Sequence, residues 1–73
     1  MSENTGRQYG WLAAELGKRR LPLQVCQSAA GFYLGTKEEN QPFSRESVEY
    51  WRTREEANEA LLSQRKWTQR RAP

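Results

Sequence analysis

The segment 21–27 (LPLQVCQ) constrains the fold most, because its apolar and polar residues alternate with the period of two that is typical of a strand. Leucine and valine fall on one face, and glutamine and cysteine fall on the other. The tetrapeptide SAAG follows as a short turn. The segment 31–36 predicts a second strand, with Phe32 and Leu34 on one face and Tyr33 on the opposite one. Together the two strands predict a hairpin.

A third strand is predicted over 47–52 (SVEYWR), with Val48 and Tyr50 toward the core and Trp51 on the opposite face. The preceding stretch KEENQPFS is polar and contains a proline, which indicates an exposed connection. A hairpin alone is marginal in water, whereas three strands covered by helices can form a stable unit.

Helical spacing marks both sides of the strands. A helix is predicted over 6–18, where apolar residues recur at intervals of three and four, and Pro22 prevents its continuation. A second helix is predicted over 53–64, because Thr53 is a good N-cap residue and Glu56 completes a capping box. The apolar stripe of this second helix consists of small residues and leucine, which suits close packing against a sheet.

These elements predict an α+β fold in which residues 1–73 form a single domain in the order helix, three strands, helix. We expect a mostly antiparallel sheet with both helices on one face, and flexible ends at 1–5 and 69–73. The expected core consists of Leu12, Leu16, Leu23, Val25, Phe32, Leu34, Val48, Tyr50, Ala57 and Leu61.

Trp67 stands beyond the second helix, in the closing stretch RKWTQRRAP. We expect the chain to turn back there so that Trp67 is partly buried at the edge of the core, because a small domain gains much of its burial from a few large rings. Arg70 and Arg71 are expected to stay disordered in solvent.

The net charge of +3 is unevenly distributed. Acidic residues gather between 46 and 59, while the cations form two blocks. These blocks are Lys18, Arg19 and Arg20, and then Arg65, Lys66, Arg70 and Arg71. Cations combined with an aromatic ring are typical of nucleic-acid-binding surfaces. Cations are also ordinary at the ends of helices, so both interpretations stay open.

A second candidate surface is aromatic. If Val48 and Tyr50 face the core, Tyr33 and Trp51 lie on the other face of the sheet together with Cys26. An exposed aromatic patch often marks a surface that binds a partner. The alternative is that a helix or the C-terminal tail covers these rings.

Features of enzymes are scarce. The chain has no histidine and a single cysteine, Cys26, so the commonest general base and the familiar zinc-site spacings are missing. Gly31 and Gly35 do not form a phosphate-binding loop, because no lysine–serine or lysine–threonine pair follows them into a helix. We therefore expect no catalysis, no metal and no cofactor. The lone cysteine and the lack of a signal-peptide pattern or long apolar run indicate a cytoplasmic protein without a membrane partner.

The stretches GFYLGT and PFSRESVEYWRTREEANEAL resemble short uncharacterised proteins that are carried on bacterial plasmids, phages and integrative elements. The resemblance covers roughly residues 21–68, and its marks are GFY at 31–33, SRES at 44–47, Tyr50 and the helix over 53–61. It implies a bacterial cytoplasmic setting and a small accessory role.

The sequence thus predicts a small non-enzymatic accessory or regulatory binding module that associates with nucleic acid through the basic clusters at 18–20 and 65–71. The alternative is a protein-interaction module, for instance an inhibitor of a host factor, that uses Tyr33 and Trp51. Convergence of the basic clusters in space favours the first. Divergence, with an uncovered aromatic patch, favours the second.

Overall fold

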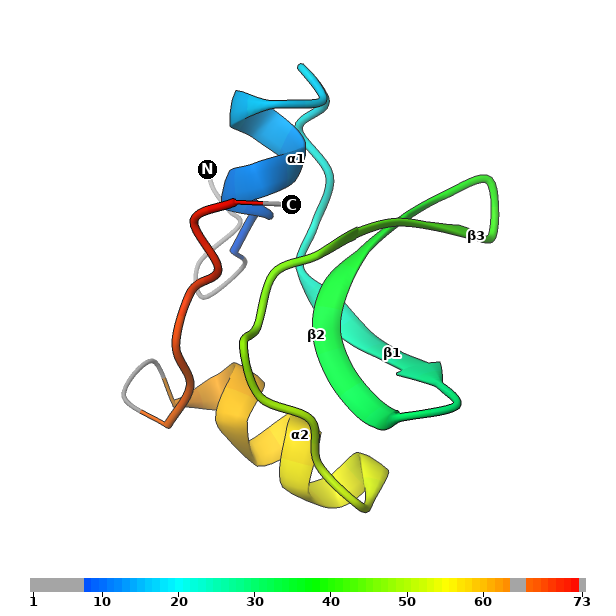
Figure 1. The fold of residues 1–73 in the computed structure, drawn as a ribbon, viewed down its shortest axis with the longest axis vertical. Helices are drawn as coiled ribbons and strands as arrows, with labels where there is room; N and C mark the ends of the chain where they lie inside the picture. Colours follow the sequence, from blue (N-terminus) through cyan, green and yellow to red (C-terminus); the bar gives the residue numbers. More distant parts are fainter. Residues whose placement is uncertain (1–7, 64–65, 73) are drawn as a thin grey trace, which may run out of the picture.

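A computed structural model describes residues 8–63 and 66–72 of the chain. The elements are α1 (Trp11–Glu15), β1 (Gln24–Ser28), β2 (Gly31–Glu38), β3 (Gln41–Arg45) and α2 (Arg54–Leu62). The strands form one antiparallel sheet in the order β1-β2-β3, with one helix before it and one after it in the chain (Figure 1). The predicted α+β fold is confirmed, while the predicted flexible end at 1–5 lies outside the described residues.

The hairpin of β1 and β2 forms where the alternation predicts it. Its register runs from Gln24 opposite Gly35 to Ser28 opposite Gly31. Gly31 closes the turn with a φ of 134°, a conformation that residues with a side chain rarely adopt. A Cβ atom at Gly31 would also lie 2.8 Å from the carbonyl oxygen of Trp51, so glycine is required for two reasons.

The prediction of a third strand over 47–52 is wrong. The third strand is β3, which occupies the second half of the stretch KEENQPFS that we expected to be a loop. Glu39 and Asn40 have φ values of 53° and 68°, and such left-handed pairs form the two-residue turns that suit a hairpin. Pro42 is tolerated because β3 is an edge strand and the β2–β3 register shifts next to its partner Lys37.

The segment after β3 continues along the same edge of β2 without forming a regular strand. Glu46 N and Ser47 N both donate to Leu34 O, at 2.8 and 3.0 Å. Trp51 then pairs with Phe32 through two hydrogen bonds of 2.7 and 2.9 Å between their backbone atoms. Glu46 and Ser47 are the buried residues here. The predicted core positions Val48 and Tyr50 are instead exposed, because the chain turns polar side chains inward to make hydrogen bonds.

The main core lies between α2 and the strands β1 and β2. Leu23, Leu34, Ala57 and Ala60 are buried, and other apolar residues pack around them. These surrounding residues are Val25, Phe32, Trp51, Leu61 and Trp67. The structure therefore confirms the predicted partial burial of Trp67. It also confirms the predicted core positions on β1, β2 and α2.

The first helix is shorter than the predicted 6–18. Tyr9 is extended and pairs with Pro22, while Gly10 N donates to Leu21 O, so residues 8–10 run beside 21–23 as a short ladder. After Glu15 the helix unwinds, and Lys18 has a left-handed φ of 58°. Leu12 is buried as predicted, but Leu16 is 57% exposed and is not a core residue.

Both helices face the same side of the sheet, as predicted. Leu34 and Thr36 are two positions apart on β2, so their side chains lie on the same face of the sheet. Leu34 packs against the buried alanines of α2, and Thr36, two positions on, lies against Gly10 at the start of α1. The C-terminal tail runs between the two helices, from the end of α2 to the start of α1 (Figure 1). Within residues 8–63 and 66–72, no helix is long and apolar enough to cross a membrane.

Candidate nucleic-acid interface

A buried carboxylate fixes the end of the molecule where α1, β3 and the tail meet. Glu46 follows β3 directly, and its side chain is completely buried. Its carboxylate accepts hydrogen bonds from Leu12 N at 2.8 Å and from Ala13 N at 3.0 Å. These are N–H groups of the first turn of α1, which have no partner within a helix. The N-cap residue Gly10 has no side chain to satisfy them, so Glu46 takes the place of a capping residue.

The same carboxylate joins the tail to the sheet. Gln69 Nε2 donates to Glu46 Oε1 at 2.7 Å, and Ser44 Oγ donates to Oε2 at 2.5 Å. Arg70 N donates to Glu46 O at 2.7 Å. Burial by itself raises the pKa of Glu46, but the hydrogen bonds from Ser44, Leu12, Gln69 and Ala13 outweigh burial and lower the pKa below its usual value. The group is therefore a carboxylate near neutral pH.

Two exposed aromatic rings stand beside this buried network. Tyr9 and Trp11 lie on either side of Gly10, and both rings remain more than a third exposed. The guanidinium of Arg20 lies over the ring of Tyr9, with its central carbon 5.2 Å from the ring centroid. The guanidinium of Arg71 lies over the ring of Trp11 at 5.1 Å. We call these four residues the cation–aromatic surface.

The two predicted basic clusters meet in part at this surface. Arg20 reaches it from the chain after α1, and Arg71 reaches it from the C-terminal tail. The Cα atoms of Tyr9 and Trp11 can be no more than about 7 Å apart, because only one residue separates them. Two arginines that stand 51 positions apart in the sequence thus lie over rings whose residues are only two positions apart.

The other predicted basic residues have different roles. Arg19 forms an exposed ion pair with Glu38, at 3.3 Å between Nε and Oε2. Arg70 Nη1 donates to Arg45 O at 3.1 Å, so Arg70 belongs partly to the structure of the tail. Lys18 is exposed in the chain just after α1, and Lys66 is exposed in the tail that follows α2. Arg65 lies outside the described residues.

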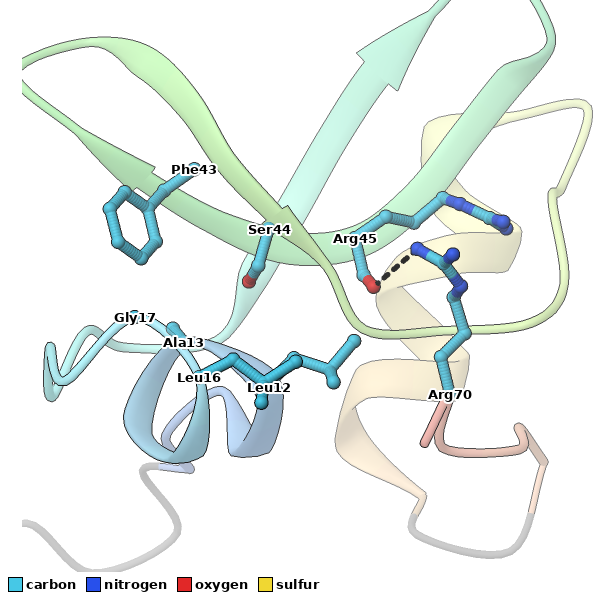
Figure 2. Close-up of a pocket in the computed structure, with 8 residues that line it drawn as sticks. All are labelled: Leu12, Ala13, Leu16, Gly17, Phe43, Ser44, Arg45 and Arg70. Atoms are coloured by element: carbon cyan, nitrogen blue, oxygen red, sulfur yellow. Dashed lines mark hydrogen bonds between the residues drawn. The ribbon is translucent and has the colours of Figure 1, made fainter. Parts of the chain in front are cut away.

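A pocket opens between α1 and β3, next to the cation–aromatic surface. It has a volume of about 360 Å³, and its walls combine apolar side chains with two arginines. The lining residues are Leu12, Ala13, Leu16, Gly17, Phe43, Ser44, Arg45 and Arg70. Figure 2 shows Phe43 and Gly17 at one end and Arg70 with the backbone of Arg45 at the other. None of the described lining residues is acidic.

The predicted aromatic partner surface does not form. Tyr33 is only 6% exposed, and the side chain of Tyr50, from the segment after β3, lies against its ring. The ring of Tyr50 meets Tyr33 edge to face, with 5.8 Å between the centroids, and Arg45 lies over Tyr50 at 4.7 Å. Trp51 faces the other way and packs partly buried against the main core. The prediction was wrong because it rested on a third strand over 47–52.

Other candidate chemistry is limited in the described part of the chain. Cys26 is buried, and burial raises the pKa of its thiol more than nearby Lys37 and the hydrogen bond with Tyr33 lower it. Such a thiol is protonated and poorly reactive near neutral pH. Residues 8–63 and 66–72 contain no group of three or more metal-ligating side chains that could hold an ion.

Sequence reasoning missed Tyr9 and Trp11 as surface residues and Glu46 as the group that organises them. Trp11 falls outside the apolar stripe of α1, and this offset was the available signal. Comparison with known proteins found no matching family model, no matching curated protein and no matching solved structure.

Proposed function

We propose that the protein is a small accessory module that binds nucleic acid through the cation–aromatic surface. One observation carries the proposal: arginines from two distant segments lie over two exposed rings whose residues are only two positions apart in the chain. Proteins that bind single-stranded nucleic acid combine cations for the phosphates with aromatic rings on which bases stack. Arginine suits this role because its planar group stacks on rings and also forms paired hydrogen bonds with phosphate.

The electrostatics of this end of the molecule support the proposal. Four arginines lie on or next to it, namely Arg20, Arg45, Arg70 and Arg71. The nearby carboxylate of Glu46 is buried and accepts four hydrogen bonds, so it is not displayed to a ligand. Glu15 is the exposed acid one helical turn from Trp11, and its charge opposes phosphate binding at that ring.

The alternative protein-interaction module loses its original basis, since Tyr33 is covered and Trp51 packs against the core. Residues 21–68 resemble short proteins that are carried on bacterial plasmids, phages and integrative elements. We therefore include in this proposal an accessory role in a bacterium that carries such an element. A module of this size would act by occupying nucleic acid or by bringing a partner to it.

A salt titration of binding tests the proposal. The full chain is titrated into fluorescently labelled single-stranded DNA, single-stranded RNA and duplex DNA, and anisotropy reports the affinity. The logarithm of the affinity should fall linearly with the logarithm of salt concentration, with a slope of about −0.7 to −0.9 per neutralised phosphate. Replacing both Arg20 and Arg71 with glutamine should make that slope shallower by the amount that corresponds to one or two phosphate contacts.

The control for each single substitution is Arg52→Gln, which removes one exposed positive charge directly before α2. The helix α2 lies at the other end of the long axis from α1 (Figure 1). This variant should keep the slope of the unaltered protein. The absence of binding to all three nucleic acids at low salt would end the proposal. Equal losses in Arg52→Gln and in each of the single variants Arg20→Gln and Arg71→Gln would show that only net charge matters, not this surface.

A further inference from the structure

We infer that the pocket between α1 and β3 receives one unpaired base, so that the module prefers single-stranded nucleic acid to duplex. The inference rests on the proposed function and names the class of nucleic acid that the surface takes. It draws on a separate part of the structure, since the pocket residues are different from the four residues of the cation–aromatic surface.

The shape of the pocket suits a small planar group. A volume of about 360 Å³ is near the lower end of the range of about 300–1,000 Å³ that is typical of pockets for small molecules. The ring of Phe43 lies directly against Gly17, because a Cβ atom at Gly17 would be 2.5 Å from its Cε2 atom. The ring is nevertheless 37% exposed, so it offers a free surface to a second ring. Leu16 adds an apolar wall that is more than half exposed.

The charges of the pocket suit the backbone that follows a base. Arg70 stands at the end opposite Phe43, with one amino group donating to Arg45 O (Figure 2). This hydrogen bond orients the guanidinium and uses only one of its five N–H donors. Arg70 supplies the positive charge at this end, because the guanidinium of Arg45 turns away to lie over Tyr50. No described lining residue is acidic, so the pocket complements a phosphate and opposes an acidic side chain.

Residues that line the pocket are adjacent in the chain to residues of the cation–aromatic surface. Arg70 lines the pocket while Arg71 covers Trp11, and Leu12 lines the pocket while Trp11 carries the ring. Successive Cα atoms are about 3.8 Å apart, so the backbone that carries the Trp11 ring directly adjoins the backbone that forms the pocket wall. A base in a duplex is paired and stacked and does not reach a pocket without being flipped out, which costs free energy. A single strand avoids this cost.

The test compares a labelled single strand with the same sequence annealed to its complement. The unaltered protein should bind the single strand more tightly. Phe43→Ala should weaken single-strand binding by about 5- to 150-fold, the range for losing one base stacked on an aromatic ring. Duplex binding should stay within twofold. Leu16→Gln, which changes an exposed wall without entering the core, should weaken single-strand binding in the same direction.

A single strand that contains 2-aminopurine gives a direct readout, because the fluorescence of this base changes when it stacks. The change should occur with the unaltered protein and disappear with Phe43→Ala and Phe43→Leu, while Phe43→Tyr should retain it. Circular dichroism of each variant confirms that the fold is intact. Equal affinity for single strand and duplex, both indifferent to Phe43, would overturn this inference and leave the proposed function standing. Loss of all nucleic-acid binding would overturn both. Phe43-dependent binding of an apolar peptide with an acidic end, without binding of the single strand, would assign the pocket to a different ligand.

Discussion

Gln69 donates a hydrogen bond from its side-chain amide to the buried carboxylate of Glu46, at 2.7 Å, and so joins the C-terminal tail to the end of β3. The bridge pair of Ser47 with Gln69 and the hydrogen bond from Arg70 N to Glu46 O continue the same contact. Residues 69 and 70, which we expected to belong to a flexible end, thus make specific hydrogen bonds. The position of Arg71 on Trp11 depends on them, so the buried network and the cation–aromatic surface are physically coupled.

Glu46→Gln is the first prediction. The amide replaces one acceptor oxygen with an NH₂ group, which faces donors that then lack a partner. We expect a loss of roughly 1–3 kcal/mol in the free energy of unfolding, the usual cost of a buried group without its hydrogen bond. Thermal unfolding followed by circular dichroism measures this, and each kcal/mol lowers Tm by about 4–8 °C in a domain of this size. Glu59→Gln, at an exposed position on α2, is the matched control and should leave Tm nearly unchanged.

The pH dependence of stability is the second prediction. Hydrogen bonding lowers the pKa of Glu46 below its ordinary value of 4.5 despite its burial, and the pKa of Glu49 is likewise lowered by hydrogen bonds from Thr68 that outweigh burial. A lowered folded-state pKa contributes stability that is complete above the unfolded value and is lost as pH falls through the folded value. The urea midpoint should therefore be steady above about pH 5 and fall below the ordinary glutamate value. Glu46→Gln should flatten this fall, and an equally steep fall in that variant would assign it to other groups.

Gly10→Ala is the third prediction, and its sign is informative. Gly10 has ordinary extended angles, with φ of −73° and ψ of 122°, so alanine there would normally add about 0.4–1 kcal/mol of stability. In this fold the new Cβ atom would lie 2.5 Å from Thr36 Cγ2 and 2.6 Å from Glu46 Oε2. We expect destabilisation by about 1–3 kcal/mol, as for other overpacked sites. Adding Thr36→Ser removes one of the two collisions and should recover part of the loss in chemical denaturation. A stabilised Gly10→Ala protein would contradict this packing.

These residues also show what the sequence could and could not predict. The second helix is predicted within two residues at each end, because Thr53 caps it through a local hydrogen bond to Glu56 N at 3.1 Å. The strand β3 was missed because Pro42 and its polar neighbours are typical of a loop, whereas an edge strand tolerates them. The buried role of Glu46 has no local signal. Its partners Leu12, Ala13 and Gln69 are 23 to 34 positions away, so only the folded chain brings them together.

Trp67→Ala is the fourth prediction. The ring packs against the core cluster between the sheet and α2 and remains partly exposed. Its loss should lower the free energy of unfolding by somewhat less than the about 3–5 kcal/mol that a fully buried aromatic ring costs. Denaturant unfolding measures the change. Any loss of nucleic-acid binding should follow the loss of folded protein and vanish when binding is measured well below Tm. Unchanged stability with abolished binding would make Trp67 a stacking residue instead.

Trp11→Ala is the last prediction, and it should behave in the opposite way. The ring is exposed, and its described cation contact is the guanidinium of Arg71, an exposed pair that contributes only about 0.5–1 kcal/mol. The free energy of unfolding should therefore change by no more than about that amount, while affinity for a single strand falls by roughly 5- to 150-fold through loss of a stacking ring. Trp11→Phe, which keeps an aromatic face, should retain most of the affinity.

Glu15→Gln, which removes the acid one turn from Trp11, should raise affinity at low salt and lose this advantage as salt screens the charge. If Trp11→Ala leaves binding intact while Arg71→Gln weakens it, the arginine binds phosphate on its own and the ring serves only to position it.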